Sequence, residues 1–397
     1  MHTLVLSHLS IVNSLGAGLA ATHAALRERR SGLQPCRFET VTLPTYVGEV
    51  AGVDEVRIRA DLAHFDCRNN RLAQMGLEQD GFARGVAVAR DKYGPERIGL
   101  FLGTSTSGIF DTELAYRRRD PRTGALPAEF RYSSTQNTFS LADFVRRYFD
   151  LHGPAAVVSS ACSTTAKVFG NAARMISAGL CEAAIVGGAD SLCLTTLYGF
   201  HSLGLVSEAP CRPFDAQRNG ISIGEGAGFA LLEKATGQEN GDAVLLLGVG
   251  ESSDAYHMST PHPEGLGARL AMERALAAAQ LSPGSIDYVN LHGTASKTND
   301  AAEDRAICDL FGTHTPCSST KGWTGHTLGT AGITEAIISA LSIRHGLLPG
   351  SVHTLGVDPA LRSRYLVENQ SARVDRVMSN SFGFGGSNCS VILGRAG

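Results

Sequence analysis

The sequence lacks the features that mark several classes of protein. Its nine cysteines are odd in number, scattered and without a C-x-x-C pair, which argues against a disulfide framework and against a zinc site. No apolar run is long enough to cross a bilayer, and the first residues lack the basic and apolar segments of a signal peptide. The net charge of −3 includes no long block of one sign and gives no reason to expect nucleic-acid binding. These absences favour a reduced, soluble, cytoplasmic protein.

The composition is typical of an α/β protein with a large core. The 397 residues are 43% hydrophobic and 18% charged, and the length exceeds that of a usual single domain. Short apolar runs alternate with helical patterns, which predicts buried strands between helices. The runs that we interpret as strands are RIGLFLG (97–103), AAVVSSA (155–161), AAIVGGA (183–189) and GFALLE (228–233).

Two stretches of the second half echo two stretches of the first. A helical pattern at 71–94 leads into IGLFLGTSTSG, and a helical pattern at 268–280 leads into IDYVNLHGTAS. Likewise, TLVLSHLSIVNSLG near the start resembles AVLLLGVGESSDA. A duplicated α/β unit, divided near 237–242 into residues 1–238 and 239–397, would account for the length. The alternative is that any two strand–helix segments look alike.

One cysteine stands where a strand pattern meets a helical pattern. Cys162 follows AAVVSSA and precedes apolar residues at helical spacing that end at Gly179. Ser163, Thr164 and Thr165 are residue types that satisfy free N–H groups in a first helical turn. The positive end of a helix favours thiolate over thiol, and a sharp turn between strand and helix exposes a side chain. The position predicts a nucleophile, although most cysteines of an α/β core only pack.

Two histidines lie in loops rich in small residues. His292, in NLHGTAS, follows a strand pattern, and α/β proteins place their chemistry at the carboxyl ends of strands. His326, in STKGWTGHTLGTAGITEA, precedes a helical pattern, with Lys321 before it and Glu335 after it. Small neighbours allow close approach of a ligand or of backbone, so we expect both rings at the site. His257, in SSDAYHMSTP, is interpreted as structural.

These stretches occur together in one known family. The motifs, in chain order, are SSAC, RPFDAQRNGISIGEGAGFALLE, SSDAYHMSTPHP, HGTAS, TKGWTGHTLGTAGITEAI and SNSFGFGGSN. Together they resemble β-ketoacyl-[acyl-carrier-protein] synthases of the elongating type, from LSIVNSLGAG near the start to the last strand pattern. Each motif is weak by itself, whereas their joint order and spacing are specific. The resemblance implies an α/β thiolase-like fold with duplicated halves in a layered αβαβα arrangement.

The resemblance also implies a catalytic Cys-His-His triad of Cys162, His292 and His326. Cys162 would accept an acyl group from acyl carrier protein. A malonyl thioester would then lose CO2, and the resulting carbanion would attack the acyl-cysteine. Decarboxylation builds negative charge on the thioester oxygen, to which two neutral imidazoles can donate hydrogen bonds. A cysteine hydrolase would need one histidine and an orienting Asn or Asp.

Further roles follow from the same resemblance. The backbone N–H groups of Cys162 and Phe384 would form an oxyanion hole for acyl transfer, and Phe382 and Phe384 in FGFGG would gate the acyl pocket. Lys321 would act electrostatically beside the catalytic histidines and pair with Glu335. A purely structural ion pair is the alternative.

The rim of the implied phosphopantetheine tunnel departs from the family pattern. Thr294 and Ser296, and more weakly Ser259, match positions that would bind the phosphopantetheine. Many family members read Thr-Pro-x-Gly-Asp where this chain has SKTND at 296–300, which puts the carrier or acyl preference in doubt. This variant, continued by NDAAEDRA, resembles synthases from aryl-polyene and related pigment clusters. Those enzymes extend conjugated chains, often beside a synthase-like partner that lacks the nucleophile.

Acyl carrier protein is the implied partner. Because the substrates are carried on its phosphopantetheine, no cofactor and no catalytic metal are implied. Carrier proteins are acidic, so the arginine clusters at 27–30 and 117–119 are candidates for steering them, with a solvated charged face as the alternative. The family dimerises through an edge strand, for which AAVVSSA is the candidate. The second subunit would be another copy or a synthase-like partner.

Two other activities share this fold. Thiolases use a second cysteine in a Cys-x-Gly motif near the C-terminus, where this chain has SFGFGGSN, and Cys389 beyond it is interpreted as core. Non-condensing partner subunits of the chain-length-factor kind lose the nucleophile, so Cys162 and both histidines argue against that assignment. We therefore predict a condensing enzyme that elongates a fatty-acid, polyketide or aryl-polyene chain.

Overall fold

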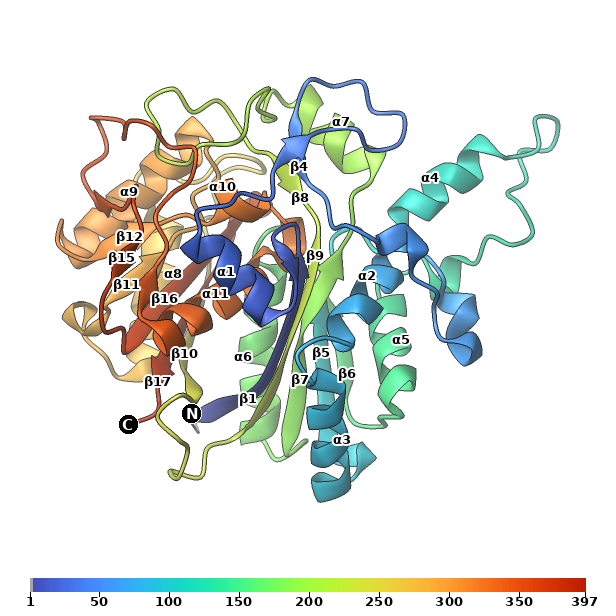
Figure 1. Cartoon of the computed structure of the whole chain (residues 1–397), viewed down its shortest axis with the longest axis horizontal. Helices are drawn as coiled ribbons and strands as arrows, with labels where there is room; N and C mark the ends of the chain where they lie inside the picture. Colours follow the sequence, from blue (N-terminus) through green and yellow to red (C-terminus); the bar gives the residue numbers. More distant parts are fainter. Residues whose placement is uncertain (1–2) are drawn as a thin grey trace.

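The structure is a computed structural model that describes residues 3–397. It has two layers of strands, with helices between them and on both outer faces (Figure 1). Most of the first half of the chain, from blue to green, lies on one side, and most of the second half, from yellow to red, lies on the other. The predicted layered αβαβα arrangement of a thiolase-like fold is confirmed. No helix within residues 3–397 is long and apolar enough to span a membrane.

The first strand layer comes from the N-terminal half. Its strands are β1 (Leu4–Asn13), β2 (Gly16–Ala17), β5 (Ile98–Gly103), β6 (Ala155–Val158), β7 (Ala183–Asp190) and β9 (Gly226–Lys234). The order is β1-β9-β7-β5-β6, with β2 beside β1. β5 runs parallel to β7 and β6, whereas β9 is antiparallel to β1 and β7. Every residue of β5 and β7 is buried, as expected for continuous apolar runs covered on both faces.

The second strand layer comes from the C-terminal half. Its strands are β10 (Val244–Ser253), β11 (Tyr288–Asn290), β12 (Pro316–Ser318), β14 (Arg364–Tyr365), β16 (Arg376–Gly383) and β17 (Ser387–Arg395). The order is β10-β17-β16-β11-β12-β14. β11 runs parallel to β16 and β12, whereas β17 is antiparallel to β10 and β16. Strand for strand, β10, β17, β16, β11 and β12 repeat the order and directions of β1, β9, β7, β5 and β6.

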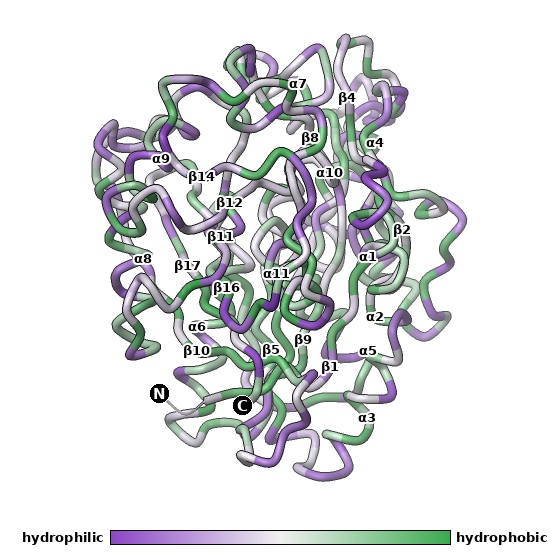
Figure 2. The backbone as a smooth tube through the Cα atoms, turned by 60° about the vertical axis from the view of Figure 1, so that its left-hand side comes forward, coloured by the Kyte–Doolittle hydropathy of each residue, from purple (hydrophilic) through white to green (hydrophobic). Residues whose placement is uncertain are grey.

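The two layers join at one corner. β1 pairs with β10 at Leu4↔Leu246 and Val5↔Leu245. Beyond this joint the layers separate, and α6 (Thr164–Ser177) and α11 (Ala331–His345) fill the space between them. The two helices contact each other, and hydrophobic residues are concentrated on the strands around them (Figure 2). Their N-terminal ends are therefore fixed within a packed core.

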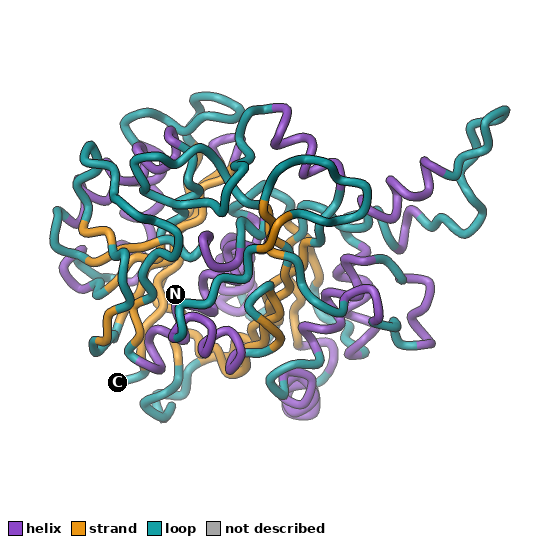
Figure 3. Tube along the Cα trace, turned by 45° about the horizontal axis from the view of Figure 1, so that its top comes forward, coloured by secondary structure: helices purple, strands orange, loops and turns teal. Residues whose placement is uncertain are grey.

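Other helices and loops cover the outer faces and the rim. α8 packs on β10 and β17, and α2, α3 and α5 pack on the first layer. Figure 3 shows how loops gather around the strand ends, and how α4 and the loop after it project from the body. These helices are α1 (Leu19–Arg27), α2 (Arg68–Leu77), α3 (Phe82–Tyr93), α4 (Ile109–Arg117), α5 (Ser140–Phe149), α7 (Leu194–Ser202), α8 (Leu266–Ala279), α9 (Lys297–Phe311) and α10 (Lys321–Thr324). The short strands are β3 (Gln34–Pro35), β4 (Tyr46–Gly48), β8 (Ile223–Gly224), β13 (Leu347–Leu348) and β15 (Gln370–Ser371).

The predicted sequence echoes occupy equivalent places in the two layers. β1 and β10 are equivalent, as are β5 and β11 with the helices before them. One expectation is wrong: the helical pattern at 71–94 forms two helices, α2 and α3. The chain breaks at Asp80 and Gly81, where φ is 55° and 71°, and the Asp80 carboxylate accepts the N–H of Leu19 at 2.9 Å. A contact distant in sequence therefore divides the predicted helix.

A buried ion pair ties the rim to the first layer. Arg68, on α2, has a side chain that is 3% exposed and donates to both carboxylate oxygens of Glu225, which is fully buried. Glu225 also accepts the N–H groups of Val50 and Leu192, at 3.0 and 2.8 Å. The Arg68 guanidinium has two exposed partners, Asp54 at 2.8 Å and Glu49 at 3.4 Å. Glu225 thus balances the buried charge and fixes two loops.

Glu225→Ala is expected to lower the free energy of unfolding by about 3–5 kcal/mol, because it leaves a buried guanidinium without its buried partner. Chemical denaturation followed by circular dichroism measures the loss. Asp54→Ala is the matched control, since that side chain is 68% exposed. Its removal should cost less than about 1 kcal/mol. Equal losses in the two variants would contradict this account of Arg68.

Candidate active site

Cys162 lies in the turn that joins β6 to α6. Ala161, just before it, has φ of 51°, a left-handed conformation that turns the chain sharply at the sulfur. α6 begins at Thr164, so Cys162 lies near the N-terminal end of the helix, as predicted. The predicted capping is wrong, because no side chain among residues 3–397 caps α6. Instead, the Thr164 hydroxyl bonds within the turn, to Ser160 and Ala161, and the Thr165 hydroxyl donates to the carbonyl of Gly329.

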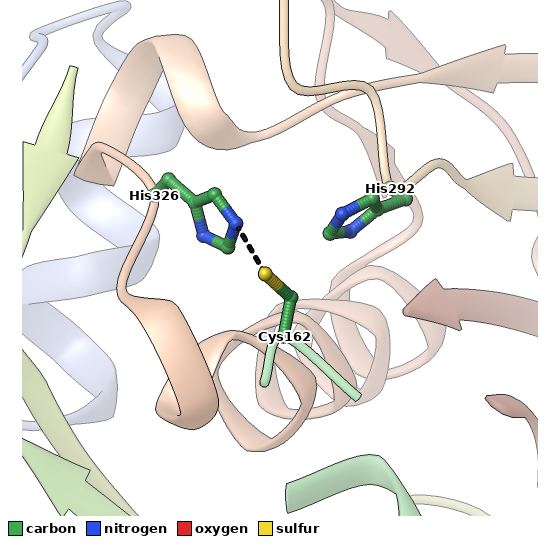
Figure 4. Close-up of side chains that lie close together, drawn as sticks. All are labelled: Cys162, His292 and His326. Atoms are coloured by element: carbon green, nitrogen blue, oxygen red, sulfur yellow. Dashed lines mark hydrogen bonds between the residues drawn. The ribbon is translucent and has the colours of Figure 1, made fainter. Parts of the chain in front are cut away.

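His326 stands in the turn before α11, and its ring meets the sulfur. Nε2 lies 3.0 Å from Sγ of Cys162 (Figure 4). On the other side of the ring, the backbone N–H of Leu328 donates to Nδ1 at 3.2 Å. A ring nitrogen that accepts a hydrogen bond carries no proton, so neutral His326 holds its proton on Nε2. The ring therefore presents an N–H group to the space around the sulfur.

His292 follows β11 and faces the same space from another side (Figure 4). The centroids of its ring and that of His326 are 5.4 Å apart, with an interplanar angle of 84°. Nζ of Lys321 lies 3.3 Å from Nδ1 of His292. An ammonium group can only donate, so Nδ1 accepts and Nε2 again carries the proton. The structure thus brings the predicted triad together, with two imidazole donors beside one thiol.

A buried ion pair lies behind the two rings. Lys321 and Glu335 are 1% and 2% exposed, and Nζ of Lys321 donates to Oε1 of Glu335 and to the carbonyl of His292. Burial lowers the pKa of His292 well below its ordinary value, and Lys321 and then His326 lower it further. Burial and Lys321 likewise lower the pKa of His326. Both rings are therefore neutral at pH 7.

The sulfur is more deeply buried than its place at a helix end suggests. Cys162 is 7% exposed, and burial raises the pKa of its thiol to about 11, although Lys321 and the backbone N–H of Phe384 act in the opposite direction. The helix end is expected to favour thiolate over thiol, but desolvation of the buried sulfur outweighs the favourable charges. The resting site holds a neutral thiol between neutral imidazoles.

The predicted gate lies against the sulfur. Phe382 and Phe384 line the pocket that contains Cys162, and the backbone N–H of Phe384 bonds to its sulfur. The ring of Phe384 is 5.7 Å from that of Phe200, which lines the same pocket. Gly385 has φ of 79°, a conformation that glycine adopts without strain. The turn can therefore carry Phe384 next to the sulfur of Cys162.

The predicted phosphopantetheine residues line the same pocket. Thr294, Ser296 and Ser259 surround it together with the triad. The hydroxyls of Thr294 and Ser296 are 3.0 Å apart, and that of Ser296 caps α9 by accepting the N–H of Asn299. Thr298 and Asn299 also line the pocket, so the departure from the family pattern at 296–300 lies on its wall. His257 lies on an exposed loop and accepts the N–H of Ser259 at 3.2 Å.

The triad is also a set of atoms of the kind that bind metals. Sγ of Cys162 and one nitrogen each of His292 and His326 lie within 4.8 Å of one another. Thiolate and imidazole are zinc ligands. The hydrogen bond from Leu328 to Nδ1, however, leaves the proton of His326 on the nitrogen that faces the sulfur. The arrangement fits hydrogen-bond donation better than metal binding.

Two buried carboxylates hold the site loops, and sequence reasoning missed both. Glu303, on α9, accepts the N–H groups of His292 and Gly293 at 2.8 and 2.7 Å. Asp190, at the end of β7, accepts the N–H and the hydroxyl of Thr330. In the sequence, nothing distinguishes Glu303 from the other acidic residues of NDAAEDRA. The one available signal for Asp190 is its place at the carboxyl end of a strand pattern.

Most arginines of the two predicted steering clusters have acidic partners. The pairs are Arg27–Glu28, Arg29–Glu368, Arg30–Glu28, Arg117–Glu39 and Arg118–Glu129. This pairing reduces the positive charge that either cluster presents. Their role in steering a carrier protein stays a prediction.

Comparison with known proteins agrees with this geometry. Residues 68–237 match the family model "Beta-ketoacyl synthase, N-terminal domain", and residues 243–355 match "Beta-ketoacyl synthase, C-terminal domain". The chain is 32% identical to 3-oxoacyl-[acyl-carrier-protein] synthase 2 of Coxiella burnetii, over 98% of each protein. A chain of the ketosynthase (ApeO) in complex with its chain length factor (ApeC) from Xenorhabdus doucetiae is 38% identical, with a TM-score of 0.90 over 100% of this chain and 98% of that one. The ishigamide ketosynthase/chain length factor gives 27% identity and a TM-score of 0.89 over 100% of both chains. The chain belongs to the beta-ketoacyl synthase family.

Proposed function

We propose that this chain is a β-ketoacyl-[acyl-carrier-protein] synthase that condenses malonyl carrier protein with an acyl group held on Cys162. One observation carries the proposal: the sulfur lies 3.0 Å from Nε2 of His326, in a pocket that His292 also lines. The identity to a 3-oxoacyl-[acyl-carrier-protein] synthase over nearly the whole chain supports it. A thiolase would need a cysteine in the loop that here reads FGFGG.

The first step is acyl transfer to the sulfur. Sγ of Cys162 attacks the carbonyl carbon of the acyl thioester, and the proton that its thiol gives up passes to the phosphopantetheine sulfur, which leaves as a thiol. Because the resting thiol is neutral, the thiolate needs stabilisation as it forms, which the N–H groups of His326 Nε2 and Phe384 provide. The backbone N–H groups of Cys162 and Phe384 serve the tetrahedral oxyanion, and Phe382 and Phe384 gate the acyl pocket.

The second step is decarboxylation and condensation. The bond between the malonyl C2 and its carboxylate breaks, CO2 leaves, and the electron pair spreads onto the thioester oxygen. Nε2–H of His292 and Nε2–H of His326 donate to that oxygen. C2 then attacks the acyl carbonyl, the sulfur of Cys162 leaves as a thiolate that takes up a proton from water, and a 3-ketoacyl thioester results. Lys321 and Glu335 act behind the rings by keeping them neutral and oriented.

The substrates arrive on the phosphopantetheine of acyl carrier protein, so we propose no resident cofactor and no metal. Thr294 and Ser296 bind the amides of that arm, and Ser259 contributes at the mouth of the pocket. Residues 1–238 form the half that carries the nucleophile, and residues 239–397 form the half that carries both histidines. The repeated strand order supports this division. The nine unpaired cysteines fit a reducing compartment, and we place the protein in the cytoplasm.

The second subunit binds along β6. This strand ends the large sheet, pairs with β5 on one side, and has four half-buried residues. An unpaired strand edge is a ready site for pairing with another chain. The similarity to ketosynthases solved with chain length factors favours a synthase-like partner over a second copy. The same similarity, with SKTND at the pocket wall, favours an aryl-polyene type of product over a saturated fatty acid.

Cys162→Ala is expected to abolish the acyl-enzyme seen by intact-protein mass spectrometry, because no other sulfur lies in the described pocket. Cys162→Gln, which resembles an acyl-cysteine, should raise decarboxylation of malonyl carrier protein without condensation. Cys36→Ala, which removes a half-buried thiol elsewhere, should acylate normally. Persistent acylation of Cys162→Ala would exclude Cys162 as the nucleophile.

In the Cys162→Gln background, His292→Ala and His326→Ala should each slow decarboxylation by about 100-fold or more, the usual effect of losing an oxyanion donor. In the presence of Cys162, the same changes should slow acylation less. CO2 release and intact mass measure the two steps separately. His152→Ala, an exposed histidine, is the control. Equal loss of both steps would contradict the proposed donor role.

The raised thiol pKa predicts the pH dependence of alkylation. Well below a pKa of about 11, the thiolate fraction rises with pH. The rate at which iodoacetamide modifies Cys162 in the free enzyme should therefore climb about tenfold per pH unit between pH 7 and 9, since the thiolate is the reactive form. A mass-spectrometric time course on the Cys162 peptide measures this rate. A plateau above pH 7 would show that the helix end outweighs burial after all.

A further inference from the structure

Asp190 is a buried carboxylate that the proposed reaction does not use. It is the last residue of β7 and is fully buried. Oδ1 accepts the N–H groups of Ser105 and Thr106 at 2.6 and 2.8 Å, and the hydroxyls of Thr104 and Thr106 at 3.0 and 2.9 Å. Oδ1 therefore faces donors only. An NH2 group or an apolar side chain in its place would leave these buried donors without an acceptor, at a cost in stability.

The other oxygen holds the turn between His326 and α11. Oδ2 accepts the N–H and the hydroxyl of Thr330, at 2.9 and 3.2 Å. Gly329, one residue earlier, packs directly on this carboxylate, because a Cβ there would lie 2.8 Å from Oδ2. The carbonyl of Gly329 is bound from the other side by the hydroxyl of Thr165, on α6. The turn is thus clamped from both β7 and α6.

The clamped turn contains a strained residue, Leu328, that determines which ring nitrogen of His326 carries the proton. Leu328 has φ of 54°, a left-handed conformation that side chains with a Cβ seldom adopt. Strained backbone persists where surrounding contacts over-determine it. The strain has a consequence at the site, because it is the N–H of Leu328 that donates to Nδ1 of His326. Without that bond, Nδ1 of neutral His326 would be free to carry the proton, and Nε2, the nitrogen that faces Cys162, would lose its N–H in that tautomer.

We propose that Asp190 is a positioning residue for His326: by clamping Thr330 it holds Leu328 in its left-handed conformation and so fixes the Nε2–H tautomer. The proposal rests on the proposed condensing function, in which that N–H stabilises the enolate. It implies that loss of Asp190 slows decarboxylation more than acyl transfer. Acyl transfer also draws on the N–H of Phe384, which Asp190 does not contact.

The test uses Asp190→Asn, which keeps the volume but turns one acceptor oxygen into an NH2 group facing N–H donors. In the Cys162→Gln background, it should slow malonyl decarboxylation by about 10- to 100-fold, the scale of a small misplacement of a catalytic group. With Cys162 present, acylation should change by less than about 3-fold, since that step keeps its other donor. Thr330→Val removes a single hydroxyl contact and should slow decarboxylation by about 2- to 10-fold.

A spectroscopic measurement separates positioning from general damage. With 15N-labelled histidine, Nδ1 of His326 should be unprotonated in the parent and partly protonated in Asp190→Asn, with His326→Ala identifying the signal. Asp304→Asn is the matched control, because Asp304 is 4% exposed and accepts the N–H groups of Arg362 and Ser363 away from the histidine turn. It should leave the tautomer and decarboxylation unchanged.

The outcomes distinguish this proposal from the function on which it rests. If Cys162→Gln itself fails to decarboxylate malonyl carrier protein, the condensing function is wrong. If Cys162→Gln decarboxylates malonyl carrier protein, and adding Asp190→Asn changes neither that rate nor the protonation of His326 on Nε2, the positioning role alone is overturned. The same holds if Asp304→Asn slows the reaction as much. Should Asp190→Asn not fold, as judged by its melting temperature, Thr330→Val decides by the same two readouts.

Discussion

The candidate active site depends on one buried cation. Lys321 is almost completely enclosed, and Glu335, also buried, balances its charge. Removing one partner of such a pair leaves an uncompensated charge and costs about 3–5 kcal/mol. The positive charge, together with burial, keeps His292 and His326 unprotonated, and its contact with Nδ1 of His292 orients that ring. A neutral imidazole can donate from Nε2 without carrying a charge into the pocket. The chemistry that we propose therefore starts from an ion pair that touches no substrate.

The duplicated architecture explains why the sulfur and a histidine meet. β6 and β12 are equivalent strands, and α6 and α11 are the equivalent helices between the layers. Cys162 occupies the turn before α6, and His326 occupies the turn before α11. Because the two helices pack against each other, their N-terminal turns face one space. The Cys162–His326 contact thus joins equivalent positions of two halves, and His292 enters from the end of β11, the equivalent of β5.

The sequence predicts the residues of the proposed triad better than the groups that support them. Cys162, His292 and His326 stand in motifs whose order is specific, and their framing by small residues follows from the need for close approach. Glu303 and Asp190 carry no comparable signal, because a buried carboxylate is defined by distant N–H groups that the chain brings together only on folding. The same reason accounts for the helix break at Asp80, whose carboxylate bonds to Leu19. The raised pKa of the Cys162 thiol is not foreseen from the sequence for the same reason, because the burial that raises it is a property of the whole fold.

Three of the residues with a left-handed backbone lie beside the proposed reacting groups. Ala161, Ala295 and Leu328 have φ of 51°, 67° and 54°, and they adjoin Cys162, Thr294 and the His326 turn. Each left-handed residue with a Cβ costs about 1–2 kcal/mol, so three such residues at one site are a substantial part of the 5–15 kcal/mol by which proteins are typically stable. Glycine at these positions would remove the strain but would let the turns relax into other conformations. Asp190 holds the turn next to Leu328 through Thr330, and Glu303 accepts the N–H groups of His292 and Gly293, close to Ala295. The N–H donor of His326 thus depends on local strain that a distant, buried carboxylate holds, whereas the turn at the sulfur is held by hydroxyl bonds among its own residues.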